Sequence, residues 1–346
     1  MRNRIAGTLL WLPDPRPSPK GPVAVHTLYR STQRVLAAKN RWDLEMMIDT
    51  VPRVVAEQTA VSATAEPTLF SAAALAAVRA MPGFALAADR IIDGRLGLNY
   101  RDPARHRLFA DRGKLMIAFY ALYLNARPNE TGCRLTASRL EATCVEHGFS
   151  GRVRVRTMIQ LMLHAGYLEI DPEPADGRFK PLLPTARLAD YHLEYWTQVL
   201  GALAGLRPDL AASLQHLERP SFRNALCVVV GDAYPASPTF ARRPDRLAGI
   251  GELDSGWLIM LRLASARRGG VPGPSANALS RQCGVSRSHV ANVLRLAGET
   301  GLIDREGTAK AFQASAALVD RVEAFCAETL VLFADAVPRA LALEAA

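Results

Sequence analysis

The strongest constraint on the fold is a helix-turn-helix pattern that occurs twice along the chain. The clearer copy lies between Ser275 and Asp304. Ser275 and Ser286 are typical N-terminal caps of helices, and Gly284 can adopt the left-handed backbone conformation that a tight turn requires. The spacing predicts a short helix after Ser275 and a second helix that runs from Ser286 to about Thr300.

The second helix of this copy separates apolar from polar residues by face. Helical periodicity places four apolar residues on one side and five polar residues on the other. The apolar set is Val290, Val293, Leu294 and Ala297, and the polar set is Arg287, Ser288, His289, Asn292 and Arg295. Hydrogen-bond donors therefore lie on the outer face of an element that can enter a DNA groove.

A short wing is predicted after this helix. Gly301 is a typical residue for ending a helix, and the pair Leu302-Ile303 favours a strand. The segment from Arg305 to Lys310 is long enough only for a short turn before the chain returns. Helix, turn, helix, strand and turn follow one another in the order of a winged helix.

The segment from Leu135 to Ile170 repeats this plan. Leu140 precedes Cys144 by four residues, as Leu279 precedes Cys283. Further equivalent positions are Gly148 and Gly284, Ser150 and Ser286, Arg152 and Arg287, Val155 and Val290, and Gly166 and Gly301. Chance is a poor explanation of either copy when two copies share one plan.

The first copy differs from the second in its turn and in its wing. Val145–His147 is expected to lengthen the turn between the two helices. Asp171–Arg178 has the proline and glycine of a wing tip, and Phe179–Leu183 reads as the return strand. A capped helix follows each wing, Ala186–Leu206 behind Thr185 and Ala316–Ala336 behind Ser315.

The motif SRSHVANVLRLAGETGLI resembles the recognition helix and first wing strand of winged-helix transcriptional regulators of the MarR and Crp types. In those families the residues just after the capping Ser, and those one turn further on, reach base edges. The resemblance therefore implies that Arg287, Ser288 and Asn292 read bases, with Arg295 nearer the DNA backbone.

The first copy and the wings add further candidates for DNA binding. Arg152, Arg154, Arg156 and Gln160 would line the first recognition helix, although a solvated helix face is the commoner fate of such arginines. Only about three of these side chains can point to one groove, and Arg154 is the one that can lie toward the body of the domain instead. An Arg at the N-terminal end of such a helix can contact guanine with two hydrogen bonds, and the helix dipole attracts phosphate. The wing residues Arg178, Lys180, Arg305 and Lys310 are expected to contact phosphates.

The charge of the chain favours an anionic partner. The formal net charge is +9 and the sequence pI is about 9.6. A basic balance alone can serve solubility, but its placement strengthens the argument. Between Arg262 and Lys310 there are eight Arg or Lys against three acidic residues, so the second helix-turn-helix carries more than its share.

These patterns divide the chain into five parts. They are a disordered, proline-rich arm at 1–22, an N-terminal helical region at 23–100, a first winged-helix domain with its trailing helix at 101–206, a helical connector at 207–254, and a second winged-helix domain with a C-terminal helix at 255–346. The predicted helices outside the repeats are Val25–Thr59, Ser71–Met81, Phe84–Asp93 and Lys114–Asn125, the last capped by Asp111. Pro220 is expected to break a helix of the connector.

Several kinds of site are not expected. The five cysteines form no CxxC pair and have no His at zinc-ligand spacing, which favours reduced thiols, with Cys144 and Cys283 buried and inert. No apolar run approaches the length of a membrane span, so we expect a cytoplasmic, nucleoid-associated protein. Common catalytic and nucleotide-binding patterns are absent, so we expect no enzyme, no cofactor and no metal.

The sequence as a whole predicts a mainly α protein with tandem winged helix-turn-helix domains, small β-wings and additional packing helices. Its expected function is sequence-specific binding of double-stranded DNA as a transcriptional regulator. A plasmid-type replication initiator and a winged-helix scaffold for protein interaction stay open as alternatives. A homodimer and a small-molecule effector also stay open. Tyr191, Tyr195 and Trp196 could line the base of a pocket for such an effector, as the resemblance to MarR-type regulators implies. Packing between helices in the core is the commoner role of such aromatic residues.

Overall fold

The computed structural model describes residues 69–100, 103–130, 132–173, 180–238, 246–304 and 312–345. The chain divides into two units, Met1–Glu66 and Pro67–Ala346, of which the second is compact. The described residues belong to the second unit. The arm predicted at 1–22 and the helix predicted at Val25–Thr59 therefore lie outside the described residues.

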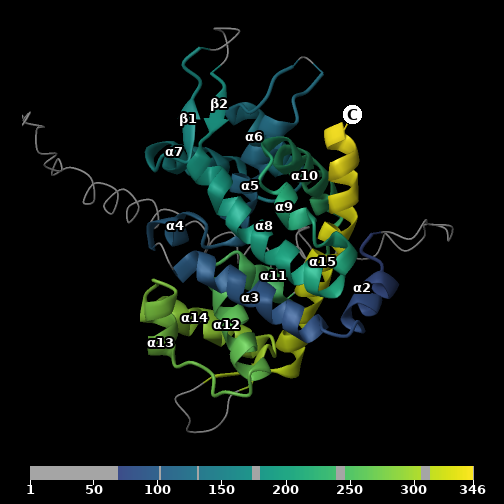
Figure 1. The fold of residues 1–346 in the computed structure, drawn as a ribbon. Helices are drawn as coiled ribbons and strands as arrows, with labels where there is room; N and C mark the ends of the chain where they lie inside the picture. The colour runs from purple at the N-terminus through teal and green to yellow at the C-terminus, as the bar shows by residue number, and fades with distance from the viewer. Residues whose placement is uncertain are drawn as a thin grey trace, which may run out of the picture. The chain divides into compact units, whose positions relative to one another are not determined.

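The second unit is mainly helical, as the sequence predicts (Figure 1). Its first half contains α2 (Ala72–Arg79), α3 (Phe84–Tyr100), α4 (Pro103–Leu108), α5 (Arg112–Ala126), α6 (Ala137–Glu146), α7 (Arg152–His164), β1 (Leu168–Ile170), β2 (Leu182–Pro184) and α8 (Ala186–Leu206). Its second half contains α9 (Ser213–His216), α10 (Pro220–Ala233), α11 (Arg246–Gly251), α12 (Gly256–Arg268), α13 (Ala276–Gln282), α14 (Arg287–Glu299), β3 (Ile303–Asp304), β4 (Gln313–Ala314) and α15 (Ala316–Ala345). Two 3-10 turns, Pro208–Leu210 and Tyr234–Ala236, flank α9 and α10.

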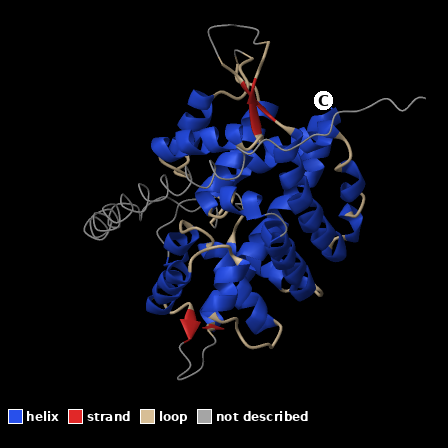
Figure 2. Ribbon diagram, turned by 90° about the vertical axis from the view of Figure 1, so that its left-hand side faces the viewer, coloured by secondary structure: helices blue, strands red, loops and turns tan. Residues whose placement is uncertain are grey.

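The two halves repeat one order of elements, from α3 to α8 and from α10 to α15. Helix α3 packs along α8 as α10 packs along α15, and α5 packs on α10 as α12 packs on α3. Each half has one antiparallel pair of strands, β1 with β2 and β3 with β4. Figure 2 shows these two pairs at opposite ends of the helical body. The repeat is thus longer than its sequence signature, because it includes α3 with α10 and α4 with α11.

Hydrogen bonds at the start of the trailing helices repeat as well. The Thr185 hydroxyl donates to the Gly166 carbonyl at 2.8 Å, and the Ser315 hydroxyl donates to the Gly301 carbonyl at 2.8 Å. Ser315 also accepts from the backbone N–H of Leu318, whereas Thr185 makes no side-chain capping bond. The strand that leaves each wing is therefore fixed to the end of the helix that precedes the wing.

Helix boundaries differ from the prediction where packing extends a helix. Helix α3 runs to Tyr100 instead of ending at Asp93, because Leu96 and Leu98 continue its buried face. The helices of the connector are separated at Pro220 as predicted, since α9 ends at His216 and Pro220 occupies the first turn of α10, where a backbone N–H has no intrahelical acceptor. The predicted end of α3 was wrong.

The C-terminal helix is also longer than predicted. Helix α15 continues beyond residue 336 to Ala345, with Pro338 inside it. Val337 and Ala340 are buried, so the apolar face of the helix extends past the predicted end. A proline removes one backbone hydrogen bond, and burial of this face offsets the loss.

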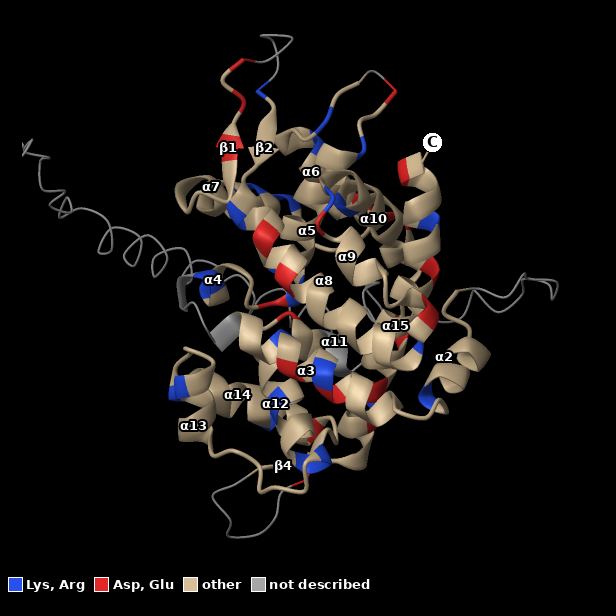
Figure 3. Ribbon diagram, viewed as in Figure 1, with Lys and Arg blue, Asp and Glu red and all other residues tan. Residues whose placement is uncertain are grey.

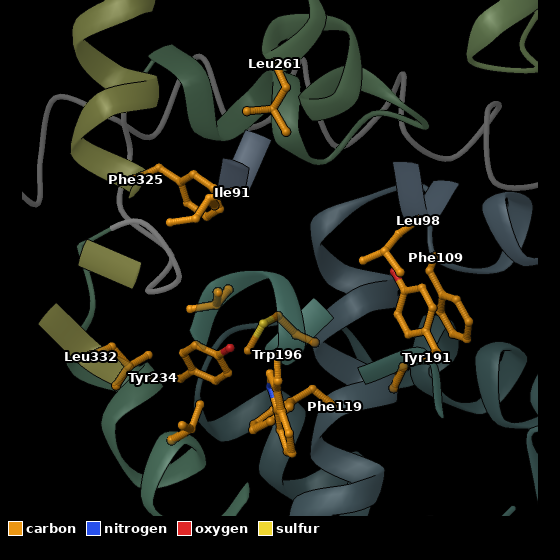
Figure 4. Packing of buried hydrophobic residues seen from close by; sticks show 14 of the residues in the cluster. Ile91, Leu98, Phe109, Phe119, Tyr191, Trp196, Tyr234, Leu261, Phe325 and Leu332 are labelled. Carbon is orange, nitrogen blue, oxygen red and sulfur yellow. The ribbon is translucent and has the colours of Figure 1, made fainter. Parts of the chain in front are cut away.

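Aromatic side chains join the helices of the core. Phe109 stacks on Tyr191 with ring centroids 4.5 Å apart, and Phe119 meets Tyr234 edge-on at 4.8 Å. Figure 4 shows Phe109 beside Tyr191 and Phe119 beside Trp196. Tyr191 and Trp196 are 1% and 3% exposed, so both lie in the interhelical core.

His192 is an ionisable group inside this aromatic core. Its ring lies among Phe119, Tyr191 and Trp196, and its Nε2 has no hydrogen-bond partner among the described residues. Burial, with a smaller contribution from the positive charge of Arg95, lowers the pKa of His192 to about 3. The core therefore holds this ring in its neutral form at neutral pH.

His192 should make the folded state sensitive to acid. Its folded pKa lies below the unfolded value of 6.5, so the unfolded chain binds the proton first and stability is lost as pH falls below about 6.5. Between about pH 7 and pH 5 the free energy of unfolding should fall by about 2 kcal/mol from this group. Urea denaturation of His192→Leu should show a correspondingly weaker pH dependence than that of the parent. Equal pH dependence in the parent and His192→Leu would contradict this assignment.

Candidate nucleic-acid interface

The two helices predicted after Ser275 and Ser286 form as α13 and α14. The Ser275 hydroxyl accepts from the backbone N–H of Ala278 at 3.2 Å, and the Ser286 hydroxyl accepts from that of His289 at 3.1 Å. Gly284 has a φ of 59°, the left-handed conformation expected of the turn. The buried face consists of Leu279, Cys283, Val290, Val293, Leu294 and Ala297. Local capping and burial of this face together fix α14 against the body of the unit.

The outer face of α14 carries four of its five predicted residues. Arg287, Ser288, Asn292 and Arg295 are exposed. One Arg295 nitrogen donates to the Asn292 side-chain oxygen at 2.9 Å and another pairs with Glu299 at 2.6 Å. Exposed pairs of this kind are weak, so a phosphate or a base can replace them.

The fifth predicted residue, His289, faces the body of the protein. Its Nε2 lies 2.7 Å from the backbone carbonyl of Asp254, in the loop before α12. The ring is partly buried there. His289 therefore anchors the start of α14 instead of extending from its outer face.

The additional residues of the first copy mainly lengthen α6, which has 10 residues against 7 in α13, and not the turn after it as predicted. Helix α6 continues through Val145 and Glu146, and Gly148 then turns the chain with a φ of 66°. No side chain caps α7, since its N-cap is Gly151 and the Ser150 hydroxyl is buried without a partner among the described residues. The additional residues thus extend α6 by most of a helical turn.

Three of the predicted side chains on α7 lie on its exposed face. Arg152, Arg156 and Gln160 are exposed, with 73% and 69% of the two arginine side chains accessible. Both arginines approach Glu141 on α6, Arg156 at 2.5 Å and Arg152 at 3.7 Å. Glu141 thus neutralises part of the positive charge on this face.

Arg154 points into the protein and does not belong to the proposed interface. Its guanidinium pairs with Asp111, whose side chain is 1% exposed, and with Glu252 at 3.1 Å. Burial alone would lower the pKa of Arg154, but these two carboxylates raise it above its usual value. The wrong assignment arose because helical spacing cannot show which arginine of α7 meets a carboxylate from another element.

The wings are described in part. Lys180 is exposed just before β2. Arg178, Arg305 and Lys310 lie outside the described residues, so their expected phosphate contacts stay predictions.

Two exposed arginines near the same surface were missed by the sequence analysis. Arg107 lies on α4, which packs on α7, and Arg281 lies on α13. Figure 1 shows α4 between α7 and α14 on one side of the unit, and Figure 3 shows basic residues on α4, α7 and α13 there. Arg281 could have been found from its place on the first helix of the motif, but Arg107 had no motif to mark it.

All five cysteines are free, four of them are buried, and burial raises the pKa of Cys144 to about 12. Within the described ranges no cluster of His, Cys, Asp or Glu could hold a metal ion. In the same ranges no single helix is long and apolar enough to cross a membrane, although α2 and α3 pass that test together as a pair bent by 99°.

Comparison with known proteins gives no relative. No family model, no curated protein and no solved structure matches the chain.

Substituting Arg154 and Arg152 should separate a structural arginine from a surface one. Arg154→Ala leaves the buried Asp111 with Lys114 as its remaining cation, and should lower the free energy of unfolding by about 2 kcal/mol. Arg152→Ala removes an exposed side chain and should change stability by no more than about 0.5 kcal/mol. Urea denaturation followed by circular dichroism measures both. Equal effects of the two substitutions would contradict the inward placement of Arg154.

Proposed function

We propose that this chain binds duplex DNA in a sequence-specific manner through α7 and α14, as a transcriptional regulator with two winged helices. The observation that carries the proposal is the placement of Arg152 and Arg287. They occupy equivalent positions at the first residue of α7 and α14, and both are exposed on helices whose opposite faces are buried. The two helices lie on the same side of the unit (Figure 1).

The chemistry of α14 suits base recognition. Arg287 makes no ion pair within the described residues, so its five N–H donors are available for the two acceptors of guanine. Asn292, one turn further on, has the donor and acceptor that pair with adenine. The N-terminus of the helix also favours a nearby phosphate through its dipole.

Other exposed basic residues fit contacts to phosphates. Arg295 lies further along the outer face of α14, and Lys180 lies at the wing of the first copy. Arg107 lies on α4 between the two helices. Phosphate contacts of this kind give affinity and register without reading sequence.

The two helices should read different half-sites. Their sequences are RVRVRTMIQ and RSHVANVLR, so the site of one chain should be asymmetric. Two helices that occupy successive major grooves need half-sites about 10–10.5 base pairs apart, centre to centre. A plasmid-type replication initiator would use such a pair of winged helices in the same way, and the DNA-binding proposal covers both roles.

One observation favours a protein-interaction scaffold for the first copy. Val153, at the position equivalent to Ser288, is 59% exposed at the start of α7. An apolar side chain there suits a protein partner, but it also suits the methyl group of thymine. The arginines on either side of this exposed position, Arg152 and Arg156 on α7, favour DNA.

Binding should weaken steeply with salt. The slope of log affinity against log salt should be near −0.9 for each phosphate neutralised. Arg295→Ala should weaken binding to all sequences alike and reduce the slope by about one unit. Arg339→Ala on α15 is the control, because it removes the same charge from an exposed site outside the proposed interface. Fluorescence anisotropy at several salt concentrations measures this, and binding that does not depend on salt rejects the proposal.

Arg287 should determine specificity. Arg287→Ala should cost about 1–3 kcal/mol at one base pair and relax the preference there, because it removes a contact to a base edge. Asn292→Ala should do the same at a neighbouring position. Selection of bound sequences from a random duplex library measures the preference for the parent and each variant, with Arg339→Ala again as the control. Unchanged preferences in both variants would show that α14 is not the recognition helix.

A further inference from the structure

Helix packing joins the two halves of the unit, with α5 on α10 and α12 on α3, and a set of polar contacts joins them as well. We call this polar set the junction and define it as residues 110–114 before and within α5 and residues 252–256 before and within α12. The backbone N–H of Ser255 donates to the Ala110 carbonyl at 2.9 Å. Lys114 pairs with Asp254 at 2.6 Å, and Arg112 pairs with Glu252 at 2.7 Å. Each ion pair links the N-terminal end of α5 in the first half with the loop before α12 in the second.

Both proposed recognition helices bind this junction from equivalent positions. Arg154 lies two residues after Arg152 on α7, and its guanidinium binds Asp111 and Glu252. His289 lies two residues after Arg287 on α14, and its ring lies 2.7 Å from the Asp254 carbonyl. The first turn of α7 thus contacts the chain just before α5, and the first turn of α14 contacts the chain just before α12. Arg154 also contacts Glu252 in the other half.

A third contact fixes the turn of the second helix-turn-helix to the first half. His106 of α4 is 4% exposed, and its Nε2 lies 2.6 Å from the Cys283 carbonyl, at the end of α13. The same nitrogen lies 2.9 Å from the Ser255 hydroxyl. Ser255 itself has a φ of 59°, which a residue other than glycine rarely adopts, so the surrounding contacts hold its backbone in place.

We propose that this junction holds α7 and α14 in one relative placement and thereby sets the spacing between the two halves of a bipartite DNA site that a single chain reads. The inference rests on the function proposed above. Arg154 and His289 are positioning residues in this account, and they do not contact DNA.

The ion pairs of the junction share partners, so a small rotation of one half would disturb several of them at once. Glu252 receives both Arg112 and Arg154, and Lys114 contacts both Asp111 and Asp254. The carboxylate of Asp111 is almost fully shielded from water, where an unpaired charge is costly. The halves should therefore keep their arrangement in the absence of DNA, and a second helix would then meet its half-site at a high effective concentration.

Spacing selectivity tests this inference directly. The probe is a duplex selected by the full-length chain from a random library of about 40 base pairs, or about four helical turns. Inserting about 5 base pairs between its halves places them on opposite faces of the DNA. This insertion should weaken binding of the parent chain about 100-fold, the gain that two linked modules have over one.

Variants of two neighbouring arginines separate positioning from contact. Arg154→Met should lose less than about tenfold on the insertion, because a loosened junction lets both helices reach the displaced halves. Arg156→Met is the matched control, since Arg156 is exposed on the same helix. It should weaken binding at every spacing alike and keep the 100-fold loss. Glu252→Gln is a second variant of the junction, which keeps Asp111 paired with Lys114 and Arg154 and should behave as Arg154→Met does.

A measurement without DNA distinguishes the inference from the proposed function. Spin labels at Ala142→Cys on α6 and Asn277→Cys on α13, both exposed, report the distance between the two motifs after Cys133→Ser removes the least buried native thiol. The parent should give one narrow distance distribution, and Glu252→Gln should broaden it. A broad distribution in the parent overturns the junction as a fixed link even where DNA binds.

Two DNA results also overturn the inference. Equal affinity of the parent for all spacings shows that the halves move independently. Two chains on each selected duplex, measured by light scattering, show that a dimer and not one chain forms the bipartite reader. Failure to select any duplex rejects the proposed function itself, whereas the spin-label distances still report on the junction.

Discussion

The arrangement of the unit depends on the contacts that the buried carboxylate of Asp111 makes. It caps α5 by accepting from the backbone N–H of Lys114 at 2.9 Å, and it pairs with the side chains of Lys114 and Arg154. Burial opposes its ionisation, but these two cations hold the pKa of Asp111 below its usual value. One buried charge therefore starts a core helix and holds the first proposed recognition helix against it. The same lysine reaches Asp254 of the second half.

The two copies share a backbone plan but differ in the electrostatics of their outer faces. On α6, Glu141 pairs with Arg156 and approaches Arg152, so the first face is partly neutralised. The equivalent position on α13 is Ser280, whose hydroxyl donates to the Val285 carbonyl at 2.7 Å and carries no charge. Arg287 consequently has no counterpart of the carboxylate that Arg152 approaches on the neighbouring helix. This difference agrees with a division in which α14 recognises more of the base sequence and α7 mainly fixes the position of the protein along the DNA.

The sequence predicted the features that local chemistry determines. Ser275, Ser286 and Gly284 have the roles assigned to them, because caps and left-handed turns depend on residues three or four positions away. Arg154 was misassigned, and α3 and α10 were not recognised as a repeated pair, because both depend on contacts between residues far apart in the chain. Periodicity can show that a face is polar, but not which of its charges meets a buried carboxylate.

Hydroxyl-radical footprinting of one chain on a selected duplex tests the central claim most directly. Two recognition helices on one side of a fixed unit should protect two segments on one face of the DNA, about 10–10.5 base pairs apart. The two segments should differ in sequence, and Arg152→Ala and Arg287→Ala should each weaken protection in one of them only. A single protected segment that is insensitive to Arg152, or no protection at low salt, would contradict the account.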